Sequence, residues 1–212
     1  MIRCAVFDFD GTVVLSNDLK RDAFLAIADD VPSGRDQMEA ILRNQTGDRH
    51  AILSRFAETV GIRDRLPSLL ARYTSYCHDA IVACPLRAGA AFALAHMKES
   101  GLCNYINSST PTEPLSRIVQ ARFPLGMFDG IYGGYGCKLS NLVAIGRVAH
   151  AARHEIVMVG DGIDDRDAAH DFGCRFIGVA GGTLSTTNDA EALVEDLVSL
   201  TTLVCKTNDG SA

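Results

Sequence analysis

The sequence predicts an α/β fold: a Rossmann-like, doubly wound parallel sheet core with an inserted helical bundle. Three observations predict it. Short apolar segments bounded by turn residues alternate with longer stretches of helical spacing, an order typical of parallel sheets with right-handed helical crossovers. A long interval after the first apolar segment has helical spacing throughout. Polar residues follow the apolar segments, and open α/β sheets bind ligands at the carboxyl ends of their strands.

Five segments are expected to form strands, because each is short, apolar and bounded by turn residues. They are residues 2–7, 102–106, 130–134, 155–160 and 175–181. Five other stretches have the apolar periodicity of helices and are expected to cover the sheet. They are, in order, about 87–100, 111–122, 139–151, 164–172 and 189–200.

Residues 16–84 interrupt this alternation. Apolar side chains such as Ile52, Phe56 and Val60 recur there at helical spacing, and no segment reads convincingly as a strand. A connection of this length is better explained by a helical subdomain of about four helices than by a loop. The predicted domains are a core of residues 1–15 and 85–212 and a helical domain of residues 16–84.

Composition and charge exclude several classes of protein. The chain has 212 residues, 47% of them hydrophobic, and a net charge of −6, whereas proteins that bind nucleic acid usually present a basic face. No apolar run approaches the roughly 20 residues that span a bilayer, and the N-terminal sequence does not resemble a secretory signal. We therefore expect a cytoplasmic protein without nucleic-acid or membrane partners. The seven cysteines include no CxxC pair and indicate neither a disulfide framework nor a zinc site.

Polar residues follow four of the predicted strands. They are Asp8 and Asp10, Ser108 and Ser109, Lys138, and finally Asp161 with Asp165. Carboxylates this close cannot all stay ionised without a cation, so the four acids predict a hard, oxygen-binding metal such as Mg²⁺. Magnesium held by few protein carboxylates usually also contacts phosphate oxygens. The pattern therefore predicts phosphoryl chemistry.

Four stretches, in this order, resemble the motifs of the haloacid dehalogenase-like hydrolase superfamily. They are DFDGT (8–12), NYINSSTP (104–111), Lys138 and VGDGIDDRDAA (159–169). The stretch PLRAGAAFALAHMKESGL also resembles the helix that leads to the second motif. The helical insertion resembles the cap domain of the family's first subclass, which closes over a small-molecule active site. This resemblance covers nearly the whole chain and implies a Mg²⁺ cofactor and a phosphorylated metabolite as substrate.

The resemblance also implies roles for the first motif. Asp8 matches the nucleophile that attacks phosphorus and forms an aspartyl-phosphate, and Asp10 matches the acid/base that protonates the leaving oxygen and then activates water. Gly11 allows a tight turn close to the phosphate, and Thr12 steadies that turn. In the family the metal is bound by the carboxylate matching Asp8, the backbone carbonyl matching Asp10 and the acid matching Asp161.

The second and third motifs are expected to supply donors to the phosphate. Ser108 matches the second-motif position, with Asn107 and Ser109 as alternatives. The third motif lacks the common Lys-Pro form. Lys138 is therefore identified by its spacing and as the only lysine between positions 99 and 205.

The last motif contains two further acids. Asp165 is expected to hold metal-bound water or to orient Lys138. Asp164 occupies a position that is often Asn in relatives, and a supporting role is expected for it.

The helical domain carries candidates for substrate selection. Because relatives often select the substrate with cap loops, the resemblance implies that Arg49 or His50, in the stretch TGDRH (46–50), contacts the substrate. The alternative is an ordinary helix start, with Asp48 as its N-cap. The sequence indicates no oligomeric state.

The presence of Asp10 decides between reactions within the family. Dehalogenases lack this second acid because a halide leaving group needs no proton. We therefore expect a phosphomonoesterase that acts on a phosphoglycolate- or sugar-phosphate-like metabolite. A phosphomutase of the β-phosphoglucomutase type retains the same acids and is the alternative. A response-regulator-like phosphoacceptor is a remote alternative. In response regulators the phosphorylated Asp follows a later strand, and no helical insertion follows the first strand.

Overall fold

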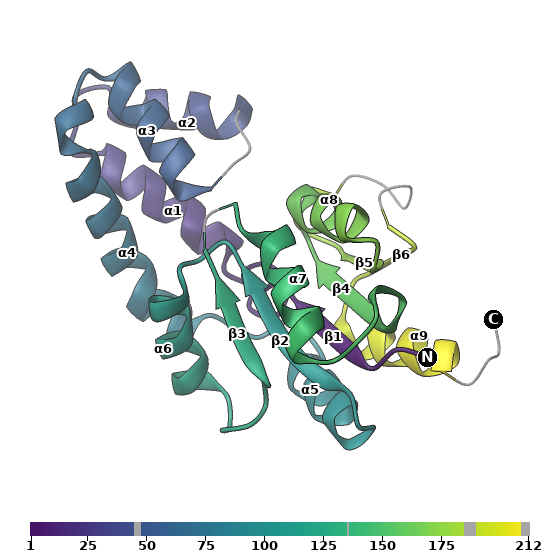
Figure 1. Cartoon of the computed structure of the whole chain (residues 1–212). Coiled ribbons are helices and arrows are strands. Elements are labelled where there is room, and N and C mark those ends of the chain that lie inside the picture. Colours follow the sequence, from purple (N-terminus) through teal and green to yellow (C-terminus); the bar gives the residue numbers. More distant parts are fainter. Residues whose placement is uncertain (45–47, 135, 185–189, 209–212) are drawn as a thin grey trace. The chain divides into compact units, whose positions relative to one another are not determined.

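The chain forms two compact units. The computed structural model describes residues 1–44, 48–134, 136–184 and 190–208. The first unit comprises Met1–Leu15 and Pro85–Ala212, and the second comprises Ser16–Cys84. Figure 1 shows the strands gathered in the first unit and helices α1 to α4 in the second.

The first unit is built on a parallel sheet whose described strands run in the order β3-β2-β1-β4-β5-β6. The strands are β1 (Cys4–Phe7), β2 (Cys103–Ser108), β3 (Gly130–Gly133), β4 (Ile156–Gly160), β5 (Arg175–Val179) and β6 (Ala192–Val194). All neighbouring pairs are parallel. The chain order reverses between β1 and β4, and such a switch point opens a ligand crevice at the carboxyl ends of the two strands.

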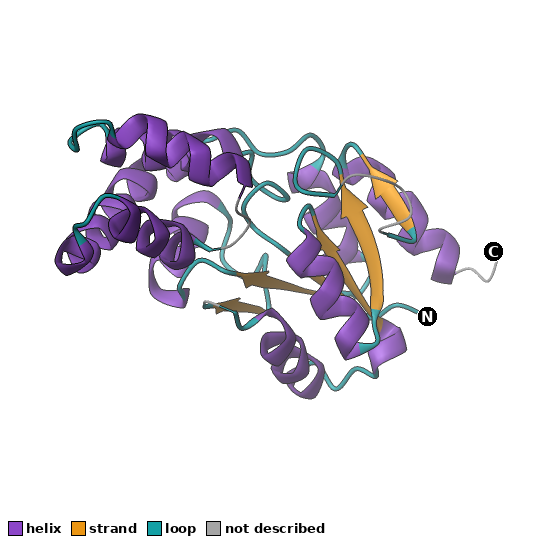
Figure 2. Cartoon of the chain, turned by 90° about the horizontal axis from the view of Figure 1, so that it is seen from above, coloured by secondary structure: helices purple, strands orange, loops and turns teal. Residues whose placement is uncertain are grey.

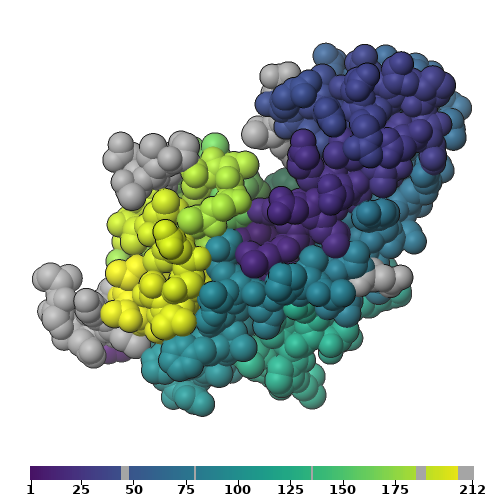
Figure 3. Space-filling view, turned by 180° about the vertical axis from the view of Figure 1, so that it is seen from behind, coloured from purple at the N-terminus to yellow at the C-terminus, as the bar shows by residue number. Residues whose placement is uncertain are grey.

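Helices cover both faces of this sheet (Figure 2). They are α5 (Ala90–Glu99), α6 (Thr112–Arg122), α7 (Lys138–Val148), α8 (Ile163–Phe172) and α9 (Leu197–Asn208), with a short 3₁₀ turn η2 (Arg153–Glu155). Helix α7 packs against α8, and α5 packs against α9; Figure 3 shows α9 in yellow beside α5. Strands β1 and β4 are buried along their whole length, as expected for central strands covered on both faces. The α/β class predicted from the sequence is confirmed.

One predicted helix is wrong in its first part. Residues Ala192–Val194, inside the helix expected over about 189–200, form strand β6 and pair with β5, while position 189 lies outside the described residues. The helix begins only at Leu197, because the Asp196 side chain accepts a hydrogen bond from the backbone N–H of Ser199 at 2.8 Å and caps it. Pairing with the sheet edge is a tertiary contact, and it overrides local helical spacing.

The second unit consists of four α-helices among its described residues, in line with the expected number. They are α1 (Asn17–Ala28), α2 (Gly34–Asn44), α3 (Arg49–Thr59) and α4 (Leu66–Ala83), with the 3₁₀ turn η1 (Arg63–Arg65) before α4. Each helix packs on its neighbour in the chain, and α4 returns to pack on α1. The rings of Phe24 and Tyr73 meet at 4.4 Å between centroids at that closing contact.

None of the described helices combines the length and the hydropathy that crossing a bilayer requires.

Candidate active site

The first strand ends in a tight loop that carries the two acids. The backbone N–H of Asp8 donates to the carbonyl of Val159 at 2.8 Å, so the pairing of β1 with β4 continues to this residue. Two backbone hydrogen bonds close the loop that follows. The N–H of Gly11 donates to Val14 O at 2.7 Å, and the N–H of Val14 donates to Phe9 O at 3.0 Å. Gly11 has a φ of +82°, a conformation that favours glycine. Both acids are thereby held at the carboxyl end of β1.

Lys138 joins the acids of separate strands. It is the first residue of α7, and its Nζ lies 3.1 Å from Oδ1 of Asp8. The same ammonium lies 3.0 Å from Oδ2 of Asp164 and also pairs with Asp165. Lys138, Asp8 and Asp165 are buried, whereas Asp164 is largely exposed. One buried cation therefore faces three carboxylates, and the role expected for Asp165, to hold metal-bound water or to orient Lys138, stays a prediction.

The segment after the fourth strand carries Asp161 and Asp165. Asp161 follows β4 directly, and its Oδ1 accepts a hydrogen bond from the hydroxyl of Thr12 at 3.3 Å. Asp165 lies in the first turn of α8, where its Oδ2 accepts from the N–H of Gly162 at 3.1 Å. A Cβ on Gly160 would lie 2.3 Å from Cγ of Asp165. The glycine at this position is what allows the Asp165 carboxylate to lie against the strand end.

Burial determines the ionisation of this cluster. It raises the pKa of Asp8 well above its usual range, and among the charged neighbours only Lys138 opposes the shift. Burial likewise raises the pKa of Asp165 to about 7, again with Lys138 acting in the opposite direction. For Lys138, burial favours the neutral form, but the carboxylates of Asp165, Asp8 and Asp164 outweigh it and raise the pKa of the ammonium. Without further positive charge, the buried carboxylates tend to take up protons.

The acids fit a hard divalent cation. Ligand oxygens of Asp8, Asp161 and Asp165 lie within 4.8 Å of one another, and all three side chains are buried. A set of carboxylate oxygens suits Mg²⁺ or Ca²⁺ and offers none of the nitrogen or sulfur ligands that zinc prefers. The carboxylate of Asp10 is not part of this group. The contribution expected from Asp10 is its backbone carbonyl.

The second strand ends beside Asp10. Ser108, the last residue of β2, is buried, and its Oγ accepts a hydrogen bond from the backbone N–H of Thr110 at 3.1 Å. The hydroxyl of Thr110 donates to Oδ2 of Asp10 at 3.0 Å. Ser109 is half-buried at the same strand end. The sequence reasoning missed Thr110, although a third hydroxyl residue directly after Ser109 was a signal available to it.

Asn107, one of the alternatives for the second motif, lies in a different environment. Its side-chain Nδ2 donates to the backbone carbonyl of Lys138 at 2.9 Å. Its Oδ1 accepts from Nδ2 of Asn141 at 2.9 Å. The side-chain amide of Asn107 thus holds the first turn of α7 in place. This turn contains Lys138, whose ammonium contacts the acids.

Arg87 is a second residue that the sequence reasoning missed. Its guanidinium donates to backbone carbonyls of three different loops, and burial lowers its pKa. The acceptors are Gly11, Thr12 at 3.1 Å, Ala180 at 3.0 Å and Glu195 at 3.0 Å. Arg87 therefore ties the loop after β1 to the loops after β5 and β6. These partners are backbone carbonyl groups, which every residue has, so the sequence does not show which of them Arg87 contacts.

Arg49 and His50 belong to the helical unit. Asp48 caps α3 by accepting from the N–H of Ala51 at 2.9 Å, as the ordinary helix-start alternative expects. The guanidinium of Arg49 lies 5.9 Å from the ring centroid of Tyr73 and also donates to Thr74 at 3.2 Å. His50 is exposed. A part for Arg49 or His50 in substrate selection stays a prediction.

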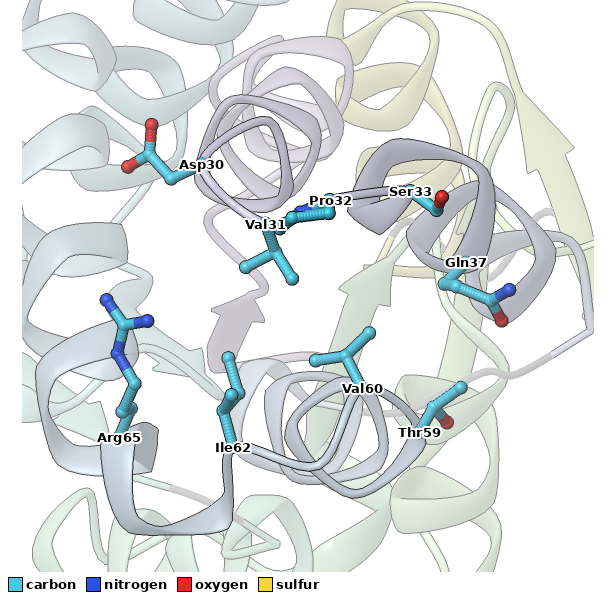
Figure 4. A pocket seen from close by; sticks show the side chains of 9 residues that line it. All are labelled: Asp30, Val31, Pro32, Ser33, Gln37, Thr59, Val60, Ile62 and Arg65. Atoms are coloured by element: carbon cyan, nitrogen blue, oxygen red, sulfur yellow. The ribbon is translucent and has the colours of Figure 1, made fainter.

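The helical unit also contains a cavity of about 510 Å³ between the α1–α2 turn and the segment that leads from α3 to α4. Figure 4 shows its lining, with the apolar side chains of Val31, Val60 and Ile62 pointing inward. Its charged lining residues are Asp30 and Arg65, and Asp30 pairs with Arg72. Asp30 is the one acid among the described residues of this lining, whereas the buried cluster of Asp8, Asp161 and Asp165 lies in the sheet unit.

Comparison with known proteins agrees with this geometry. Residues 2–173 match the model of a protein family described as haloacid dehalogenase-like hydrolase. A search of curated proteins found no match.

Solved structures share the fold at low sequence identity. A structure from Haemophilus somnus 129pt, described as a predicted phosphoglycolate phosphatase, has a TM-score of 0.80 and 16% identity and covers 96% of this chain and 98% of its own. A candidate β-phosphoglucomutase from Thermotoga maritima has a TM-score of 0.76 and 17% identity, with coverages of 97% and 99%. CbbY from Rhodobacter sphaeroides, solved in complex with phosphate, has a TM-score of 0.76 and 20% identity, with coverages of 94% and 96%.

Proposed function

Because the chain belongs to the haloacid dehalogenase-like hydrolases, we propose that it is a Mg²⁺-dependent phosphomonoesterase that hydrolyses a small phosphorylated metabolite through an aspartyl-phosphate on Asp8. One observation carries the proposal. At the switch point of the sheet, ligand oxygens of the buried Asp8, Asp161 and Asp165 lie within 4.8 Å of one another, and the ammonium of Lys138 pairs with Asp8 and Asp165. Such a set of charges suits a dianionic phosphoryl group and a divalent cation together.

In the first half of the reaction, a carboxylate oxygen of Asp8 attacks phosphorus. The bond from phosphorus to the leaving oxygen breaks, and its electron pair stays on that oxygen. Asp10, protonated at this stage, gives its proton to the leaving oxygen, so that the alcohol departs neutral. The enzyme is then left with a phosphoryl group on Asp8 and an ionised Asp10.

In the second half, a water molecule attacks the phosphorus of the aspartyl-phosphate. Asp10 takes a proton from that water as the new phosphorus–oxygen bond forms. The bond between Asp8 and phosphorus breaks, and its electron pair returns to the carboxylate. Inorganic phosphate leaves, and both acids regain their starting protonation.

The remaining residues of the site bind the phosphoryl group and balance its charge. Lys138 offers ammonium protons, and Ser108 offers a hydroxyl at the end of β2. Asp8, Asp161 and the backbone carbonyl of Asp10 would hold Mg²⁺, with Asp165 close enough to support a bound water. When bound, Mg²⁺ neutralises negative charge that develops on the phosphoryl oxygens.

The substrate is proposed to be a small phosphoglycolate- or sugar-phosphate-like metabolite, with Arg49 and His50 as candidate selecting residues. A phosphomutase of the β-phosphoglucomutase type requires the same two acids, and one of the similar structures is described as such an enzyme. Incubation with glucose 1-phosphates separates the two, because a mutase yields an isomer whereas a phosphatase releases inorganic phosphate.

Hydrolysis of p-nitrophenyl phosphate should require a divalent metal. Removing metal with EDTA is expected to lower kcat/KM by about 10²-fold or more, because the acid cluster then repels the phosphoryl dianion, and adding Mg²⁺ should restore it. Release of p-nitrophenol gives the readout, and a panel of phosphorylated metabolites assayed with Mg²⁺ identifies the preferred substrate. Equal turnover in EDTA and in Mg²⁺ would contradict the proposed metal dependence.

A further inference from the structure

The loop that follows β2 reaches the acid/base of the proposed reaction. The hydroxyl of Thr110 donates to Oδ2 of Asp10 at 3.0 Å, although the two residues are 100 positions apart in the chain. The backbone N–H of Thr110 donates to Oγ of Ser108 at 3.1 Å. One residue therefore contacts both the acid/base and the hydroxyl proposed to bind the phosphoryl group.

The backbone around Thr110 is held by the neighbouring strand. The N–H of Gly134 donates to the carbonyl of Ser108 at 3.1 Å. A Cβ on Gly133, at the end of β3, would lie 2.3 Å from the carbonyl oxygen of Thr110, so the two backbones are in close contact. The side chain of threonine is also stiff about χ1, because it is branched at Cβ. The position of the Thr110 hydroxyl is thus set by β2 and β3.

A hydroxyl group suits both stages of the reaction. Asp10 is protonated while it serves the leaving oxygen and ionised while it receives a proton from water. The hydroxyl of Thr110 can donate to Oδ2 in both states, because the proton given to the leaving oxygen is carried by the other carboxyl oxygen of Asp10. An ammonium group in the same place would add a positive charge and favour the ionised state.

We propose that Thr110 is a positioning residue whose hydroxyl holds the Asp10 carboxyl group in the orientation that serves the leaving oxygen. The contact persists through both halves of the reaction: the hydroxyl donates to Oδ2 throughout, while the other carboxyl oxygen of Asp10 carries the proton that goes to the leaving oxygen and later receives one from water. This inference rests on the proposed function, because Thr110 acts only through Asp10. General acid catalysis matters most when the leaving group is poor, and the effect of losing Thr110 must therefore depend on the leaving group.

Two aryl phosphates of similar shape test this dependence. Thr110→Val is expected to lower kcat/KM for phenyl phosphate, which has the poorer leaving group, by about tenfold, a part of the roughly 10²–10⁴-fold that general acid catalysis contributes. For p-nitrophenyl phosphate the loss should stay below about threefold. Thr110→Ser keeps the hydroxyl and should restore most of the lost activity.

The ratio of the two kcat/KM values is the quantity to compare. The same active molecules turn over both substrates, so the ratio does not depend on the fraction of the variant that is folded. Thr201→Val is the matched control, because it removes the hydroxyl of a buried threonine in α9 that donates to Val198 O at 2.7 Å. The ratio for this variant should equal that of the wild type.

A double mutant decides whether Thr110 acts through Asp10. In the Asp10→Asn background, adding Thr110→Val should change either kcat/KM by less than about twofold, because coupled residues are not additive. A loss as large as in the wild-type background would show that Thr110 acts on the substrate directly and would overturn the inference, as would an unchanged ratio for Thr110→Val alone. Neither result bears on the proposed function, which fails instead if Asp8→Asn retains activity.

Discussion

Asp8→Asn is expected to lower kcat for p-nitrophenyl phosphate by about 10⁴-fold or more, because it removes the nucleophile and one negative ligand of the proposed metal. Asn has nearly the same size as Asp, and the substitution removes a charge whose ionisation burial already opposes. The variant should therefore fold, with a thermal unfolding midpoint close to that of the wild type. Release of p-nitrophenol and thermal unfolding are measured on the same preparation.

Asp171→Asn is the matched control for this variant. Asp171 is an exposed acid of α8 in the same unit, and its substitution should leave kcat unchanged. Normal hydrolysis of p-nitrophenyl phosphate by Asp8→Asn would end the assignment of Asp8 as the nucleophile.

Lys138→Met is expected to have the largest combined effect on stability and activity. The Lys138 side chain is 9% exposed and faces three carboxylates, two of them buried. Removing the cation leaves those buried charges uncompensated, which should lower the free energy of unfolding by about 3 kcal/mol at pH 8 in EDTA. It should also lower kcat/KM by about 10³-fold, because a donor to the phosphoryl group is lost. Urea unfolding and steady-state kinetics measure the two effects.

The loss of stability caused by Lys138→Met should become smaller as the pH falls. The pKa of Asp165 is already raised to about 7 with Lys138 present, whereas an unfolded Asp titrates near a pKa of about 4. A raised pKa in the folded state means that the folded protein binds the extra proton. Loss of Lys138 raises this pKa further, so the folded variant takes up the proton at a higher pH than the wild type, and the two proteins should converge in stability as the pH falls toward about 7. Below that pH both folded proteins carry the proton, and the remaining difference should stay constant.

Lys98→Met provides the comparison for Lys138→Met. Lys98 pairs with Asp129 at 2.7 Å, with about a third of each side chain exposed. Such a pair should contribute less than about 1 kcal/mol. Equal stabilities of Lys138→Met and Lys98→Met at pH 8 would contradict the account of a buried, charge-balanced cluster.

The sheet and the acids at its edge were predictable from local patterns. Central strands such as β1 and β4 are buried on both faces and appear in the sequence as continuous apolar runs. Parallel strands present their carboxyl ends on one edge, so acids that follow β1 and β4 had to lie near each other. The helices of the second unit were likewise visible in apolar periodicity.

Other features depend on contacts between distant segments. Strand β6 has helical spacing and becomes a strand only by pairing with β5. Arg87 binds backbone carbonyls, and Thr110 contacts an acid 100 residues away. The partners of Arg87 and of Thr110 cannot be found from sequence spacing, because residue types do not show which loops come into contact.

The central claim is that Asp8 carries the phosphoryl group during turnover. Rapid acid quenching of a single turnover with p-nitrophenyl phosphate and Mg²⁺, followed by mass spectrometry of proteolytic peptides, tests it most directly. The account predicts that the peptide containing Asp8 gains the mass of one HPO₃ and that the Asp8→Asn variant shows no such gain. Product formation with the phosphoryl group on another residue, or on no residue at any quench time, would contradict it.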